Sequence, residues 1–315
     1  MLRRLEELSN LIGVSGDEGR VRRYIKAELA NIDGLDMKTD AMGNLIVHKA
    51  GKGPKVMVAA HMDEVELLPA GFIHVDGKIP LDAATRRLQE FEAVGFHRDR
   101  LQPGGVEKLL LREARNPLIH LQTAADRKTV LGHSELFVDI GAKDKDDALK
   151  YVKPGDRIGF ATKFKRLGEK RVLGKALDDR VGCAILMQLL ANDYECDFYG
   201  VFTVQEEVGL RGMHAAAYSV APDVVIVLEG TTANDMPEVK NVGFVTKMSH
   251  GPAISFMDNA TIVSPDMFKA LTETANAAGI KWQPRQGTTG ANDQGPAQRM
   301  RAGCKTGCIS VPCRY

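Results

Sequence analysis

The sequence of 315 residues lacks most features that mark membrane, secreted or nucleic-acid-binding proteins. No uninterrupted apolar run approaches the roughly 20 residues of a membrane-spanning helix. The five cysteines are odd in number and none precedes Cys183, so no disulfide framework is expected and a reducing cytoplasm is predicted. Lysine and arginine number 42 against 41 acidic residues, and a net charge of +1 favours neither nucleic acid nor a membrane as partner.

Strand-like and helix-like segments alternate along the chain from Asp178 onward. Val181, Ile185 and Leu189 repeat every four residues, as on the buried face of a helix. The apolar run at 224–228 is typical of a strand buried on both faces. The whole series consists of helices at about 179–191, 211–219 and 265–278 and strands at 199–205 and 223–228. This alternation predicts an α/β fold, a three-layer αβα domain with a mostly parallel central sheet.

The first 60 residues predict two helices followed by two strands. Leucines spaced along residues 2–11 form a helical stripe, and a second helix is expected after Ser15 and Glu18, which have capping-box spacing. Strand-like runs cover 44–48 and 55–60. The short turn between these runs predicts a hairpin or near-hairpin.

Residues 67–169 differ in character from the rest of the chain. A strand at 135–140 and a short helix at 146–151 are predicted, but 80–120 shows no clean period. We therefore expect a catalytic domain formed by 1–66 and 170–315, interrupted by an inserted domain at 67–169. Four histidines of this insertion are expected to be surface or core residues: His74, His97, His120 and His133.

Residues that can bind a metal follow three predicted strands and begin one predicted helix. The set consists of His61 and Asp63, Asp178 and Asp179, Glu206 and Glu207, and Glu229. Because ligands bind at the carboxyl ends of strands in open α/β sheets, these side chains are expected to meet in one crevice. Clustered carboxylates need a cation, and imidazole with carboxylate suits Zn²⁺, Co²⁺ or Mn²⁺ better than Ca²⁺ or Mg²⁺.

Each of these motifs alone has an ordinary structural explanation. A His-x-Asp sequence is often a surface turn, an Asp-Asp pair often caps a helix, and a Glu-Glu pair is often a solvated turn. Their occurrence together, in this order and next to buried segments, favours the metal site.

Four motifs resemble those of the cytosolic dinuclear-metal aminopeptidases. They are AHMDE at 60–64, ALDDR at 176–180, QEEVGLRG at 205–212 and LEGTTA at 228–233. This family includes the tetrahedral (TET) aminopeptidases and FrvX-like proteins, some of them named glutamyl aminopeptidase or endoglucanase. GVSGDE at 13–18 and GANDQG at 290–295 also fit, and the resemblance covers about residues 1–66 and 135–315.

The resemblance implies a role for each polar residue. His61 and Glu229 would bind one metal, Asp178 would bridge two metals, and Glu207 would bind the second. Glu206 would be the general base that activates a water held by the metals, and later the acid that protonates the leaving amine.

Three further acids would support these residues. Asp63 would accept the imidazole N–H of its neighbouring histidine and fix its tautomer. Asp179 would hold the bridging carboxylate through an unusual backbone turn with a cis peptide bond. Asp293 is assigned to structural or supporting work in the 290–295 loop.

Two departures from the family modify this expectation. In the family, an Arg-Tyr pair is followed by Ile-His, and this histidine is the last ligand of the second metal. The last residues of this sequence are Arg314 and Tyr315, so the sequence does not contain that histidine. The prediction is one tightly bound metal, one weakly bound metal and impaired activity, unless Asp293 replaces that ligand. Residues 72–134 also match poorly the small β-barrel of the family, which contributes to dimers and dodecamers.

The predicted function is therefore a cytoplasmic, metal-dependent aminopeptidase that removes N-terminal residues from short peptides and self-associates. Two alternatives remain open at this point. One is a glycoside hydrolase, although such enzymes normally use a carboxylate pair without metals. The other is a non-catalytic metal-binding or oligomer subunit.

Overall fold

The computed structural model describes residues 1–65, 79–80, 94–95, 110–113, 136–140, 142–152, 155–160, 162–236 and 245–314. The chain divides into two compact units, one formed by Met1–Glu64 with Ala176–Tyr315 and the other by Val65–Lys175. No helix within the described ranges is long and apolar enough to cross a membrane.

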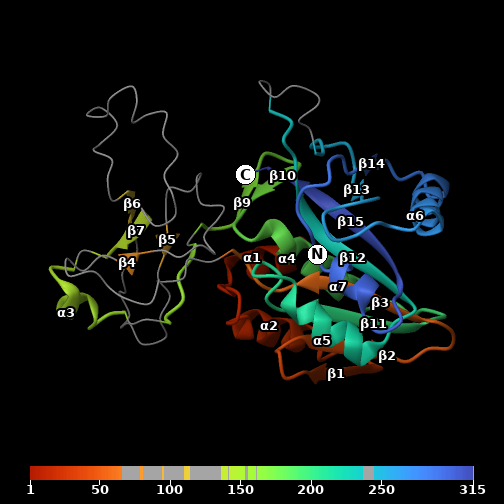
Figure 1. Cartoon of the computed structure of the whole chain (residues 1–315), viewed down its shortest axis with the longest axis horizontal. Helices are drawn as coiled ribbons and strands as arrows, with labels where there is room; N and C mark the ends of the chain where they lie inside the picture. Colours follow the sequence, from red (N-terminus) through yellow and green to blue (C-terminus); the bar gives the residue numbers. More distant parts are fainter. Residues whose placement is uncertain are drawn as a thin grey trace. The chain divides into compact units, whose positions relative to one another are not determined.

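An eight-stranded sheet forms the centre of the first unit (Figure 1). Its four central strands, β11, β3, β12 and β15, run parallel to one another. The strands, in the order of the sheet, are β1 (Leu35–Thr39), β2 (Leu45–Lys49), β11 (Asp197–Thr203), β3 (Lys55–His61), β12 (Val224–Thr232), β15 (Lys305–Cys313), β13 (Ala253–Ile254) and β14 (Gln283–Pro284). The predicted mixed α/β fold with a mostly parallel sheet is confirmed.

Helices cover both faces of this sheet. Met57 and Ala59 of β3 pack in one apolar cluster with Met213 of α5 and Ala297 of α7, while the alternate residues of the same strand are also buried. On that second face α4 packs against β3 and β12 and is covered by α1. The helices are α1 (Leu2–Asn10), α2 (Gly19–Leu29), α4 (Leu177–Leu189), α5 (Arg211–Val220), α6 (Pro265–Ala277) and α7 (Gln294–Arg299).

The strands β2 and β3 run antiparallel, as in a near-hairpin, but they do not pair directly as a hairpin would. Both strands exist, but β11 lies between them, antiparallel to β2 and parallel to β3. A short connection with turn residues indicates where the chain reverses, but not whether a distant segment enters between the two strands.

The predicted capping box at the start of α2 is wrong. The helix begins at Gly19, and the side chain of Glu18 at its N-cap position makes no capping hydrogen bond. Ser15 Oγ instead donates to Asp63 Oδ2 at 2.7 Å, and Glu18 Oε1 accepts the Gly16 N–H at 2.6 Å. Both polar side chains therefore serve contacts outside the helix.

The described residues of the second unit form short strands and one short helix. β4 (Ile79–Pro80), β7 (Leu136–Asp139) and β6 (Leu110–Glu113) form an antiparallel sheet. Two strand pairs and a helix complete the described part: β5 (Val94–Gly95) with β8 (Gly159–Phe160), β9 (Lys165–Leu167) with β10 (Arg171–Leu173), and α3 (Lys145–Ala148). β7 and α3 match the predicted strand and helix, whereas the four histidines of the insertion lie outside the described residues.

Candidate metal and catalytic site

The predicted site residues gather at the carboxyl end of the parallel strands. His61 is the last residue of β3, and it pairs in register with Thr203 at the end of β11. Glu206 and Glu207 lie in the turn that follows β11, after Val204 and Gln205, and Glu229 lies in the second half of β12. Parallel strands therefore bring together residues that lie up to 168 positions apart.

Two groups of side chains have ligand atoms close enough to share a cation. One consists of His61, Asp178 and Glu229, and the other of His61, Glu206 and Glu207, with all ligand atoms of a group within 4.8 Å of one another. His61 Nε2 lies 3.3 Å from Asp178 Oδ1 and 3.7 Å from Glu229 Oε2. The structure thus brings the five predicted ligand and base residues into one cluster.

The imidazole ring of His61 is oriented by contacts that its Nδ1 atom makes with Asp63. Its Nδ1 lies 3.1 Å from the main-chain carbonyl of Asp63, which can only accept, and 3.4 Å from Asp63 Oδ1. The closer contact is with the carbonyl rather than with the expected carboxylate. Either acceptor keeps a proton on Nδ1, so Nε2, which faces the carboxylates, is the nitrogen that a cation would bind.

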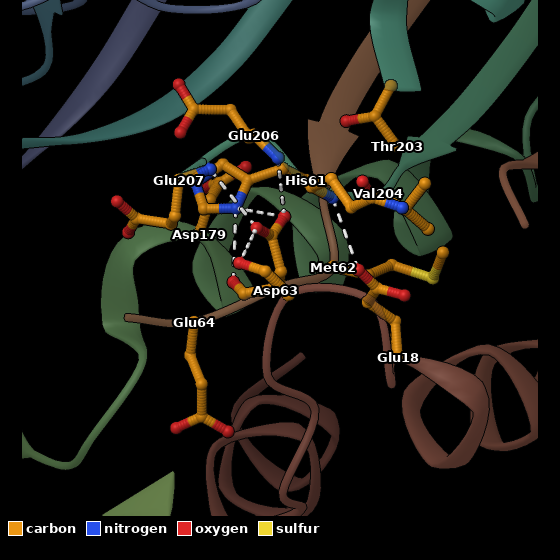
Figure 2. Close-up of polar contacts among 12 residues, drawn as sticks. Glu18, His61, Met62, Asp63, Glu64, Asp179, Thr203, Val204, Glu206 and Glu207 are labelled. Atoms are coloured by element: carbon orange, nitrogen blue, oxygen red, sulfur yellow. Dashed lines mark hydrogen bonds and ion pairs between the residues drawn. The ribbon is translucent and has the colours of Figure 1, made fainter. Parts of the chain in front are cut away.

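The buried carboxylate of Asp63 organises the turn that carries the two glutamates (Figure 2). Its Oδ1 accepts the Glu206 N–H at 3.0 Å, and its Oδ2 accepts the Glu207 N–H at 3.1 Å. The hydroxyl of Ser15 donates to Oδ2 as well. Asp63 therefore connects the histidine strand, the glutamate turn and the 13–18 segment.

Asp178 and Asp179 are joined by a cis peptide bond at the start of α4, as expected. The Gly230 N–H donates to Asp178 Oδ1 at 3.2 Å, and a Cβ at position 230 would lie 2.7 Å from Asp178 Cβ. Asp179 is fully buried and accepts the Gly182 N–H at 2.9 Å, so its carboxylate holds the first turn of the helix behind Asp178.

Asp293 lies next to the cluster but in neither of the two candidate ligand groups. Its Oδ2 accepts the hydroxyl of Thr203 at 2.6 Å, and its Oδ1 is buried without a hydrogen-bond partner. Burial raises the pKa of this carboxyl to about 6. Thr203 was not singled out in the sequence, because its role follows from its register with His61.

The charges of the cluster fit a bound cation. Burial raises the pKa of Glu206 and of Glu229 well above the ordinary glutamate value, and neighbouring carboxylates raise both further. A divalent cation among these oxygens would offset the repulsion, and one imidazole with several carboxylates is a donor set that suits Zn²⁺, Co²⁺ or Mn²⁺. The residues present therefore fit a metal.

A sequence model of the M42 glutamyl aminopeptidase family matches residues 43–315. The chain belongs to this family. The match includes all of the residues in the two candidate ligand groups. The M42 membership confirms the family expected from the four motifs and the expected class of enzyme, a hydrolase of peptide bonds.

Individual members of the M42 family match over nearly the whole chain. A proposed aminopeptidase of Acetivibrio thermocellus is 35% identical over 99% of this chain and 90% of its own length. The lysyl aminopeptidase of Pyrococcus furiosus is 30% identical over 96% of this chain and 86% of its own length. The TET1 peptidase of Pyrococcus horikoshii superimposes with a TM-score of 0.80 at 30% identity, over 100% of this chain and 91% of that one, and it assembles into a tetrahedron or a large octahedral shell.

Proposed function

We propose that this M42 family member removes N-terminal residues from short peptides in a metal-dependent reaction with Glu206 as general base. The observation that carries the proposal is the group of His61, Asp178 and Glu229 beside Glu206 and Glu207, in which His61 and Glu229 are buried and Asp178 is half-buried. The glycoside hydrolase and the non-catalytic subunit are not favoured by the family relationship.

The proposed ligands divide between two cations. His61, Asp178 and Glu229 would hold one, and the shared Asp178 with Glu207 would contribute to the second. Zn²⁺, Co²⁺ and Mn²⁺ are the proposed ions. When bound, such ions polarise the scissile carbonyl and lower the pKa of a water molecule.

Glu206 would perform the proton transfers. Its carboxylate removes a proton from the attacking water and then delivers it to the leaving amine, a role for which a raised pKa is suited. Its backbone N–H is held by Asp63, and Glu207 is its immediate neighbour. The two glutamates are neighbours in a turn whose N–H groups are held by the two oxygens of Asp63, and we propose that Glu206 serves the proton and Glu207 the cation.

We also propose that the chain self-associates, with the inserted segment 67–169 as its dimerisation domain. The shells formed by the Pyrococcus horikoshii relative support larger assemblies as well. An enclosed site would admit short peptides and exclude folded proteins.

Removal of bound metal should abolish peptide hydrolysis. A chelator should lower the rate on an aminoacyl-anilide by at least about 100-fold, because the carbonyl and the water lose their Lewis acid. Zn²⁺, Co²⁺ or Mn²⁺ added after removal of the chelator should restore the rate, and Ca²⁺ serves as the matched control. Chelator-insensitive release of reducing sugar from a glucan, with no anilide cleaved, would instead support the glycoside hydrolase.

A further inference from the structure

Glu18 is a buried acid that the proposed reaction does not use. It is only 3% exposed, although glutamate is rarely found so deep in a protein without a specific partner. Its Oε1 accepts two backbone N–H groups, that of Gly16 at 2.6 Å and that of Gln205 at 3.2 Å. The second contact reaches 187 positions along the chain, to the residue immediately before the proposed general base.

The backbone at Gln205 has a conformation that an ordinary side chain disfavours. Its φ is +56°, in the left-handed region that favours glycine. This residue turns the chain from the end of β11 into the Glu206–Glu207 pair. A residue of this kind persists only where surrounding contacts hold it.

Four consecutive backbone N–H groups of this turn are held by side chains from the first 64 residues. The acceptors are Asn44 for Val204 at 3.0 Å, Glu18 for Gln205 at 3.2 Å, and the two oxygens of Asp63 for Glu206 and Glu207. Figure 2 shows Asp63 beneath the two glutamates. The carbonyl groups of residues 204–206 accept backbone N–H groups of residues 209–212, whereas these four N–H groups depend on side chains from distant parts of the chain. Glu18 holds the one residue of the four that is left-handed.

We propose that Glu18 is a positioning residue whose carboxylate fixes the Gln205 turn and thereby aims Glu206 at the substrate and Glu207 at the cation. This inference rests on the proposed function of the two glutamates. A role in capping α2 does not explain the contacts, because the Glu18 side chain makes no capping hydrogen bond to that helix. The contact depends on the reach of the side chain and on an acceptor oxygen.

Two variants of Glu18 distinguish the effect of its side-chain length from the effect of its negative charge. Glu18→Gln keeps the length and an acceptor oxygen, and it should retain most of the wild-type kcat. Glu18→Asp keeps the charge but is one methylene shorter, and it should lower kcat by about 10–100-fold, the usual effect of losing a residue that orients a ligand. KM should stay near the wild-type value, and Asp17→Asn, an exposed neighbour, should change neither constant.

For the wild type and each variant, kcat and KM for peptide hydrolysis are measured per bound metal ion. Co²⁺ affinity is determined by visible-absorption titration, and folding is checked by thermal melting. We expect weaker Co²⁺ binding in Glu18→Asp than in Glu18→Gln, while the folded fractions of the two variants stay similar. Equal kcat and equal Co²⁺ affinity in Glu18→Asp and the wild type would overturn the inference, and so would an active Asp variant beside an inactive Gln variant. A wild type that neither binds Co²⁺ nor cleaves peptide would overturn the proposed function itself, and the role of Glu18 with it.

Discussion

Glu206→Gln should lower kcat for peptide hydrolysis by about 100- to 10,000-fold, the usual contribution of a general acid–base group. The amide has nearly the same shape as the carboxyl but cannot accept the proton of the attacking water. The backbone N–H of residue 206 still reaches Asp63, so the turn should keep its conformation. Metal content should stay at the wild-type level, since Glu206 is proposed to move protons and not to bind the cation.

The variant should be compared with Glu195→Gln, a charge-matched change at an exposed position before β11. Steady-state kinetics and elemental analysis of the same preparations give both quantities. A Glu206→Gln protein with wild-type kcat would show that another group takes the proton. Loss of metal in parallel with activity would show instead that Glu206 is a ligand.

Arg180→Met should lower the free energy of unfolding by about 3–5 kcal/mol, because it removes one partner of a buried ion pair. Arg180 is fully buried in α4, two residues after Asp178. Its guanidinium donates to four main-chain carbonyls and one carboxylate, those of Met62, Leu8, Leu11, Gly13 and Glu64. The variant would remove the guanidinium that joins the end of α1, the 11–13 segment and the residue after His61 through hydrogen bonds.

Urea unfolding followed by circular dichroism measures this change, with Lys269→Met on the exposed face of α6 as a control expected to have little effect. The double variant Arg180→Met with Glu64→Gln should lose less than the sum of the two single changes, because each single change leaves a charge behind. A loss in Arg180→Met no larger than that in Lys269→Met would show that the buried guanidinium contributes little net stability.

The central site could be predicted because each residue type follows a strong local pattern. His61, Glu206 and Glu229 lie within or just after apolar runs that form parallel strands, and the carboxyl ends of parallel strands necessarily meet. The pair at 178–179 precedes a helix with clear four-residue spacing. For these residues, the order of elements along the chain was sufficient to predict proximity.

The contacts that support the site could not be predicted in the same way. Ser15 and Glu18 have the spacing of a capping box, but the nearest acceptors and donors lie far along the chain, on Asp63 and Gln205. β2 and β3 do not pair directly for the same reason, since β11 enters between two strands that are adjacent in sequence. β15 was also missed as a central strand, because glycine and proline interrupt its apolar pattern.

The cluster around His61 is proposed to form a metal-dependent site for peptides with a free N-terminus. In the decisive experiment, the metal-loaded protein is incubated separately with a short peptide and with the N-acetylated form of the same peptide. Both reactions are followed by mass spectrometry. We expect stepwise loss of single residues from the free peptide, none from the acetylated one, and no cleavage of either when His61 is replaced by alanine. An intact free peptide, or equal cleavage of both peptides, would contradict this proposal.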